Sequence, residues 1–131
     1  MTTAQPLILL VEDDRDIRES IKEVLEDEGY SVAEAADGVE AIERLGELPT
    51  MPELVLLDLM MPRMNGVQLR AEMAKQPVWD RIPVVVLSAD ADMHSKVQGL
   101  HTAGQLEKPI KLSLLLETVS RAIELGRPAA L

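Results

Sequence analysis

The chain has no cysteine and very few aromatic residues. Its 131 residues include one tryptophan, one tyrosine and no phenylalanine. The lack of cysteine excludes disulfides, cysteine-based zinc sites and a thiol nucleophile, and it fits a reducing cytoplasm. Because aromatic side chains are nearly missing, the chain has no set of rings on which nucleic-acid bases could stack. We therefore expect a cytoplasmic protein that does not bind nucleic acid directly.

Long hydrophobic runs and basic charge are also scarce. No run of about 18 apolar residues is present to span a bilayer, and the opening MTTAQP lacks the pattern of a signal peptide. The 23 acidic residues outnumber the 13 basic ones, which gives a formal net charge of −10. Such a chain is repelled by phosphate backbones and by anionic membranes. The composition therefore indicates partners other than nucleic acids or membranes.

Short apolar runs alternate along the chain with longer helical patterns. The runs cover residues 7–11, 31–35, 54–57, 84–87 and 105–107, and the second is the most polar, as an edge strand would be. Helical patterns cover about 17–25, 37–45, 66–75, 93–100 and 112–123, and a loop is expected around Trp79. This alternation predicts a doubly wound α/β fold with a parallel sheet covered on both faces. We expect one domain over residues 1–131, with a core at about 6–125 and a loose tail at 126–131.

Polar side chains follow the apolar runs directly. In parallel sheets ligands bind at the carboxyl ends of the strands, where the winding reverses. We therefore expect one edge of the sheet to gather the carboxylates, the hydroxyl and the ammonium group that follow these runs. These residues are Glu12, Asp13 and Asp14 after the first run, Asp58 after the third, Ser88 after the fourth and Lys108 after the last.

Such a cluster of carboxylates needs positive charge. Two carboxylates about 5 Å apart repel by roughly 3 kcal/mol at an effective dielectric constant of 20, so the group requires raised pKa values or a bound cation. Oxygen ligands without histidine or cysteine favour a hard ion, and few carboxylates with open positions suit Mg²⁺. Lys108 and Ser88 could then contact a phosphate. The combination suggests phosphoryl transfer onto a carboxylate, with Asp58 as the nucleophile.

Four segments of the chain together resemble the receiver domain of two-component response regulators, over essentially residues 6–125. They are LLVEDDRDIR at 9–18, LVLLDLMMPRMNG at 54–66, VVVLSA at 84–89 and LEKPI at 106–110. The resemblance implies a flavodoxin-like (βα)5 fold with strand order 2-1-3-4-5. It also implies that Asp58 accepts a phosphoryl group from a sensor histidine kinase or a phosphotransfer protein, as one step of a phosphorelay.

The resemblance also assigns a Mg²⁺ site. Asp58 and Asp13 would bind the ion directly, Glu12 would lie nearby or act through water, and the backbone carbonyl of Met60 would complete the protein ligands. For Asp14, a helix cap or a solvated acid is the favoured interpretation. The three methionines of the 58–66 segment are expected to pack in the loop rather than bind a soft metal. His94 and His101 are expected on the surface.

The resemblance further assigns a switch. Ser88 takes the position of the family's hydroxyl and Lys108 that of its lysine, with a cis peptide bond to Pro109. Receiver domains usually carry a tyrosine or phenylalanine three residues before the lysine, but this chain has Gln105 there. The aromatic part of the switch is therefore absent, and the output to an unidentified downstream protein must take another route. We expect the last strand and the last helix to form the output face.

Three functions compete on this basis. The favoured one is a phosphorylatable receiver, a monomer or weak dimer that catalyses only its own phosphorylation and dephosphorylation and is not an enzyme on external substrates. A Mg²⁺-dependent phosphohydrolase of the haloacid-dehalogenase type would need an aspartate where Met60 stands. A pseudo-receiver, acting as an interaction module without phosphorylation, is disfavoured by the intact acidic and basic residues and favoured by Gln105.

Overall fold

The computed structural model describes residues 5–61, 63–89 and 102–126, and in them five strands form one parallel sheet. The strands follow the spatial order β2-β1-β3-β4-β5, which confirms the expected order and places the polar β2 at an edge. Between β1 and β3 the winding reverses, so the carboxyl ends of these two strands form the switch point. The strands are β1 (Leu7–Val11), β2 (Ser31–Ala35), β3 (Leu54–Asp58), β4 (Val84–Ser88) and β5 (Gly104–Glu107).

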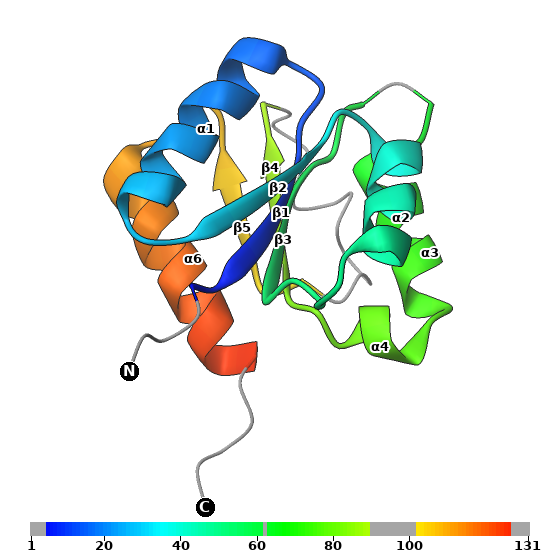
Figure 1. The fold of residues 1–131 in the computed structure, drawn as a ribbon. Helices are drawn as coiled ribbons and strands as arrows, with labels where there is room; N and C mark the ends of the chain where they lie inside the picture. The colour runs from blue at the N-terminus through cyan, green and yellow to red at the C-terminus, as the bar shows by residue number, and fades with distance from the viewer. Residues whose placement is uncertain (1–4, 62, 90–101, 127–131) are drawn as a thin grey trace, which may run out of the picture.

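Helices cover both faces of the sheet. One face carries α1 and α6, and the other carries α2 and α3, with the short α4 beside α3 (Figure 1). None of the helices in the described ranges is long and apolar enough to cross a membrane. The expected helix at 93–100, with His94 and His101, lies outside the described residues, as does the tail beyond Gly126. The described helices are α1 (Arg15–Asp27), α2 (Gly38–Glu47), α3 (Gly66–Ala74), α4 (Pro77–Asp80) and α6 (Leu112–Gly126).

The apolar strand residues divide between two hydrophobic cores. Ile8 and Leu10 of β1 face the core shared with α1 and α6, whereas Leu9 and Val11 face the core shared with α2 and α3. Strands β3 and β4 are buried along their whole length. A strand buried on both faces needs an uninterrupted apolar run, because successive side chains point to opposite faces. This is why the central strands lack the polar alternation of an exposed sheet.

Two local expectations were wrong. The segment expected as a loop around Trp79 contains the helix α4, which Pro77 opens because its fixed φ and missing N–H suit the first helical position. Met60 is 57% exposed instead of packed in its loop, although Met61 and Met64 do pack against the core next to α2 and α3. The two strands that lead into the site are also one residue longer than the apolar runs, and their last residues are Asp58 and Ser88.

Candidate functional site

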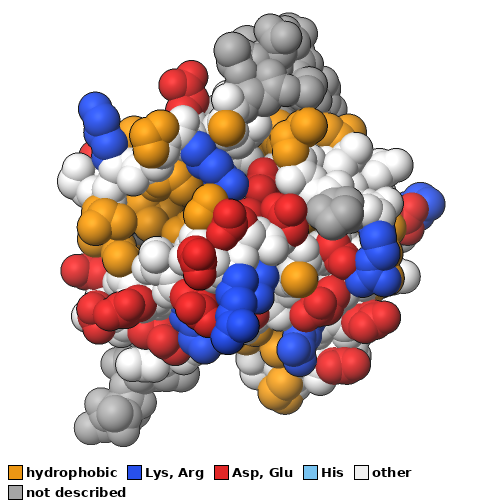
Figure 2. All heavy atoms as spheres, turned by 90° about the horizontal axis from the view of Figure 1, so that it is seen from above, with side chains coloured by type: hydrophobic (Ala, Val, Ile, Leu, Met, Phe, Trp, Pro, Cys, Tyr) orange, Lys and Arg blue, Asp and Glu red, His pale blue; other side chains and the backbone are white. Residues whose placement is uncertain are grey.

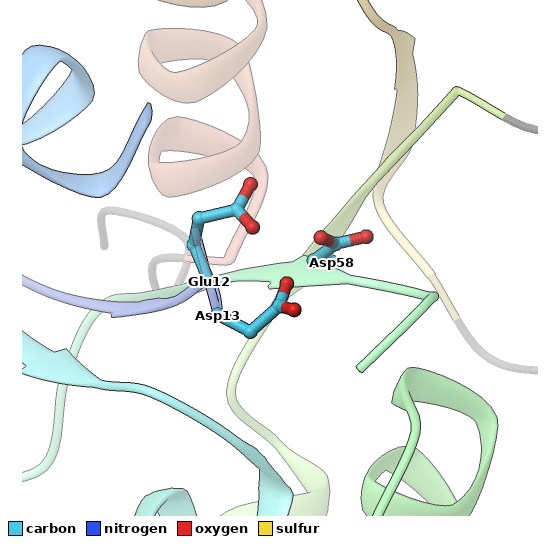
Figure 3. A group of neighbouring side chains, drawn as sticks. All are labelled: Glu12, Asp13 and Asp58. Carbon is cyan, nitrogen blue, oxygen red and sulfur yellow. The ribbon is translucent and has the colours of Figure 1, made fainter. Parts of the chain in front are cut away.

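Three carboxylates meet at the carboxyl ends of β1 and β3. In the parallel register Val11 pairs with Leu57, so Glu12 and Asp58 lie level with one another. Glu12 is fully buried and Asp58 is 3% exposed, whereas Asp13 is exposed in the turn toward α1. One carboxylate oxygen from each of these three residues lies within 4.8 Å of the other two (Figure 3). The polar residues that follow β1 and β3 in the sequence therefore form one cluster in space.

Lys108 reaches this cluster from the far side of β4. The residue follows β5, its backbone N–H donates to the carbonyl of Ser88 (2.9 Å), and its bond to Pro109 is cis. The Nζ atom lies 2.5 Å from Oε1 of Glu12 and 3.0 Å from Oδ2 of Asp58. One ammonium group thus neutralises part of the negative charge of two buried carboxylates on two different strands.

Backbone groups hold the two buried carboxylates in place. The N–H of Met60 donates to Oδ1 of Asp58 (3.0 Å), and the N–H of Asp14 donates to Oε2 of Glu12 (3.2 Å). The guanidinium of Arg18 donates to the backbone carbonyl of Glu12 (2.8 Å). Asp14 itself caps α1, because its Oδ1 accepts from the N–H of Ile17 (3.1 Å). The helix-cap interpretation of Asp14 is therefore confirmed.

Burial and charge change the titration of the site in the metal-free protein. Burial, with the adjacent Asp58 carboxylate, raises the pKa of Glu12 to about 7, although the contacts with Lys108 and the Asp14 N–H act in the opposite direction. For Lys108, burial would lower the pKa, but its bonds to Glu12 and Asp58 outweigh this effect and raise it. Near neutral pH, Glu12 therefore holds a proton more tightly than an exposed carboxylate would.

The donor set fits a hard divalent cation. Carboxylate oxygens without a nitrogen or sulfur ligand are the donors that Mg²⁺ takes, and Mg²⁺ usually binds few of them and keeps several waters. Oxygens around one Mg²⁺ lie about 2.1 Å from the ion, so small rotations of side chains already within 4.8 Å would bring them into its coordination sphere. Glu12, Asp13 and Asp58 could hold the ion, and the exposure of Asp13 leaves the site open to solvent on one side.

The edge of the sheet that carries this cluster combines charge with hydrophobic surface. Acidic and basic side chains gather near its centre, and hydrophobic side chains lie beside them on the side of α1 and α6 (Figure 2). A cavity of about 330 Å³ opens there between α1 and the start of α6. Lys108 lines this cavity together with Ile17, Ile110 and Leu115. The site is therefore continuous with an apolar surface.

The two residues of the expected switch occupy different places. Ser88 is the last residue of β4 and is fully buried, next in the sheet to the strand that ends in Asp58. Gln105 pairs with Val86 in the interior of β5 and is half-buried. Because Leu106 belongs to the core next to α6, the side chain of Gln105 points to the opposite face of the sheet. Gln105 therefore contributes a polar group to the face of the sheet opposite α6.

Sequence reasoning missed several residues that support the site. Arg63 lies in the loop after Asp58 and pairs with Asp37, 26 residues earlier, and no local pattern could have indicated this pair. The hydrogen bond from the Arg18 guanidinium to the Glu12 carbonyl also has no recognisable signal in the sequence. A capping box between Asn65 and Gln68 begins α3, and the spacing N-x-x-Q was a readable signal for it.

The fold and the site together define an α/β domain with a cluster of three carboxylates at its topological switch point. The family model of the response regulator receiver domain matches residues 8–120. Response regulator MprA of Mycobacterium leprae is 36% identical over 123 residues, which are 92% of this chain and 52% of that protein. The chain thus spans about half the length of the curated relatives it matches.

Solved structures agree with this family. The signal receiver domain of a signal transduction histidine kinase from Syntrophus aciditrophicus has a TM-score of 0.85 and 29% identity, and the match covers 95% of both chains. A response regulator receiver protein from Pseudomonas putida has a TM-score of 0.82 and 27% identity, over 92% of this chain and 99% of that one. The chain belongs to the response regulator receiver domain family of two-component signalling.

Proposed function

We propose that this domain accepts a phosphoryl group on Asp58 from the phosphohistidine of a sensor histidine kinase or a phosphotransfer protein. The observation that carries the proposal is the position of Asp58. Its carboxylate is buried at the end of β3, lies within 4.8 Å of two further carboxylates and is 3.0 Å from Lys108. Receiver-family membership supports a histidine kinase or phosphotransfer protein as the partner.

The reaction converts a carboxylate into an acyl phosphate. A carboxylate oxygen of Asp58 attacks the phosphorus, the phosphorus–nitrogen bond of the donor breaks, and the donor imidazole leaves with the bonding electron pair and takes up a proton. The transferring group carries negative charge on its outer oxygens, so catalysis depends on positioning and on positive charge. Lys108 supplies one such charge, and the N–H of Met60 holds the attacking carboxylate.

We assign the Mg²⁺ ligands as Asp13, Asp58 and the backbone carbonyl of Met60, with Glu12 nearby or acting through a water molecule. When bound, the ion neutralises charge on the incoming phosphoryl group. Burial beside Asp58 raises the pKa of Glu12 to about 7, which supports the proposal that this site needs positive charge. Ser88, buried at the end of β4, would donate a hydrogen bond to the phosphoryl group.

We further propose that the domain is a signalling phosphoacceptor and not an enzyme on external substrates. The residue two positions after Asp58 is Met60, whose side chain has no acid or base to serve repeated turnover. The downstream partner is a protein, and the state is a monomer or a weak dimer. Leu112 and Leu114 of α6 are 56% and 47% exposed, which supports contact through this helix. A cytoplasmic location stays a prediction from the composition.

The alternative is a pseudo-receiver that binds its partner without phosphorylation, and Gln105 is the observation that favours it. One experiment separates the two functions. The protein is incubated with Mg²⁺ and acetyl phosphate, and the intact mass is followed beside that of Asp58→Asn. Gain of one phosphoryl group by the wild type alone supports the phosphoacceptor. An unchanged mass, together with amide NMR spectra that do not respond to a beryllofluoride mimic, would leave the pseudo-receiver.

A further inference from the structure

The loop between β3 and α3 spans residues 59–65, of which the structure describes 59–61 and 63–65, and one carboxylate joins its Arg63 to the start of α2. Asp37 precedes α2 and is only 6% exposed. Its Oδ1 accepts from the N–H of Glu40 (2.8 Å), which caps the helix. Its Oδ2 lies 2.6 Å from one terminal nitrogen of Arg63 and accepts from the Nε of the same guanidinium at 2.8 Å. A single side chain therefore caps a helix and binds the loop that follows Asp58.

The conformation of this loop needs such support. Arg63 has a φ of 63°, in the left-handed region that residues with a Cβ rarely adopt. A residue held there is kept in place by its surroundings, and Asp37 supplies such support because two nitrogens of the Arg63 guanidinium contact one of its carboxylate oxygens.

A second contact joins the same two segments. The N–H of Gly38 donates to the carbonyl of Met64 (3.3 Å). A Cβ atom on Gly38 would lie 2.7 Å from the Cβ of Met64, so the start of α2 and the loop are in direct van der Waals contact. The loop is therefore held against α2 over two successive residues.

The other end of the loop is held at the site itself. The N–H of Gly66 donates to the carbonyl of Leu59 (3.0 Å), next to Asp58. Met60 lies between this anchor and the one at Arg63, and its N–H contacts the Asp58 carboxylate. Met60, whose carbonyl we assigned as a cation ligand, is therefore flanked along the chain by two anchored residues, Leu59 and Arg63.

We propose that Asp37 is a positioning residue of the receiver site, which sets the affinity for Mg²⁺ by fixing the 59–65 loop through Arg63. This inference rests on the function proposed above. Asp37 does not touch the reacting atoms: it acts through Arg63 and the loop backbone on Met60. Asp13 and the position of Asp58 at the end of β3 do not depend on this link, so its loss weakens the cation site without abolishing it.

Two variants separate the link from the helix cap. Asp37→Ser keeps a good capping oxygen for the Glu40 N–H but loses the charged contact with Arg63. Arg63→Ala removes the same contact from the loop side and leaves the cap in place. Arg63→Lys, which keeps the charge but not the paired nitrogens of the guanidinium, is the conservative control. The double variant Asp37→Ser with Arg63→Ala completes a cycle.

The primary measurement is the Mg²⁺ dissociation constant, from amide NMR shifts of the folded proteins. Loss of a residue that orients a ligand costs about 10- to 100-fold in metal affinity, and a change acting on one ligand through a loop should cost about 3- to 10-fold. We expect this loss in both single variants, a smaller one in Arg63→Lys, and no further loss in the double variant. At saturating Mg²⁺ the rate of labelling by acetyl phosphate should return to near the wild-type value.

Other outcomes would overturn the inference. Wild-type Mg²⁺ affinity in both single variants, or independent losses that multiply in the double variant, would leave Asp37 with a helix cap alone. Absence of Mg²⁺ binding to the wild type would also overturn it. If the wild type binds Mg²⁺ but takes up no phosphoryl group, the proposed function fails, while the NMR titrations of the variants still decide the role of Asp37.

Discussion

Gly66 is the residue where one added methyl group should damage the site most directly. A Cβ atom there would lie 2.8 Å from the carbonyl oxygen of Asp58 and 2.9 Å from the Cα of Leu59. Ordinary contacts of a Cβ begin near 3.4 Å, so Gly66→Ala requires a displacement of about half an ångström. Both neighbouring atoms belong to the backbone at the end of β3, which packs between β1 and β4 and has no room to yield.

The cost follows from these contacts. Forcing a methyl group into a closely packed site costs about 1–3 kcal/mol, and alanine recovers up to about 1 kcal/mol through its higher helix propensity. We expect Gly66→Ala to lower the free energy of unfolding by about 1–2 kcal/mol, net of these effects. The displacement falls on the carbonyl of Asp58 and on the residue before Met60, so labelling by acetyl phosphate should also become slower.

Gly46→Ala is the matched control. Gly46 lies in α2, is exposed, and a Cβ atom there would meet nothing within 4 Å. The same chemical change should stabilise the protein by about 0.4–1 kcal/mol, because alanine restricts the unfolded chain. Urea unfolding at constant slope gives both values. A Gly66→Ala protein as stable as Gly46→Ala, with an unchanged labelling rate, would refute the close approach at Asp58.

Three further predictions concern charge. The first uses protein from which Mg²⁺ has been removed by a chelator. Its free energy of unfolding should fall by about 3 kcal/mol as pH rises from about 4.5 to about 7, because folded Glu12 keeps a proton that the unfolded chain has lost. Denaturant titrations should show a weaker dependence of stability on pH for Glu12→Gln, and the same dependence in both proteins would contradict the burial of this charge. Lys108→Ala should lower the free energy of unfolding of the metal-free protein by about 3 kcal/mol at pH 8, because it leaves two buried carboxylates without the ammonium group of Lys108. Urea unfolding tests this, and added Mg²⁺ should restore part of the loss. The pKa of Asp37 is lowered, since its bonds from the Glu40 N–H and from Arg63 outweigh the effect of burial. Its contribution to stability is therefore present above pH 3.8 and is lost as pH falls through the lower folded value. The stability difference between wild type and Asp37→Asn should shrink as pH falls below 3.8, and a difference that does not change with pH would contradict this reasoning.

The sequence was sufficient for the fold and for most of the cluster, because both depend on local patterns. Uninterrupted apolar runs are required by strands that are buried on both faces, and strict alternation of such runs with helices leaves a parallel sheet as the simple solution. Residues that directly follow neighbouring parallel strands must meet at one edge. The proximity of Glu12, Asp13 and Asp58 was therefore predictable from the sequence, without any measured interatomic distance.

Tertiary structure decided the features that join distant parts of the chain. Lys108 lies 96 residues from Glu12 and 50 from Asp58, and only the closed sheet shows that one ammonium group bridges both. The raised pKa of Glu12 depends on how completely the fold removes it from water, which no spacing reveals. The pair of Asp37 and Arg63 depends on how α2 packs beside the loop after β3. Local residue patterns determined the strands and the positions of the acids, whereas packing between elements determined how those acids are neutralised and how the loop beside them is held.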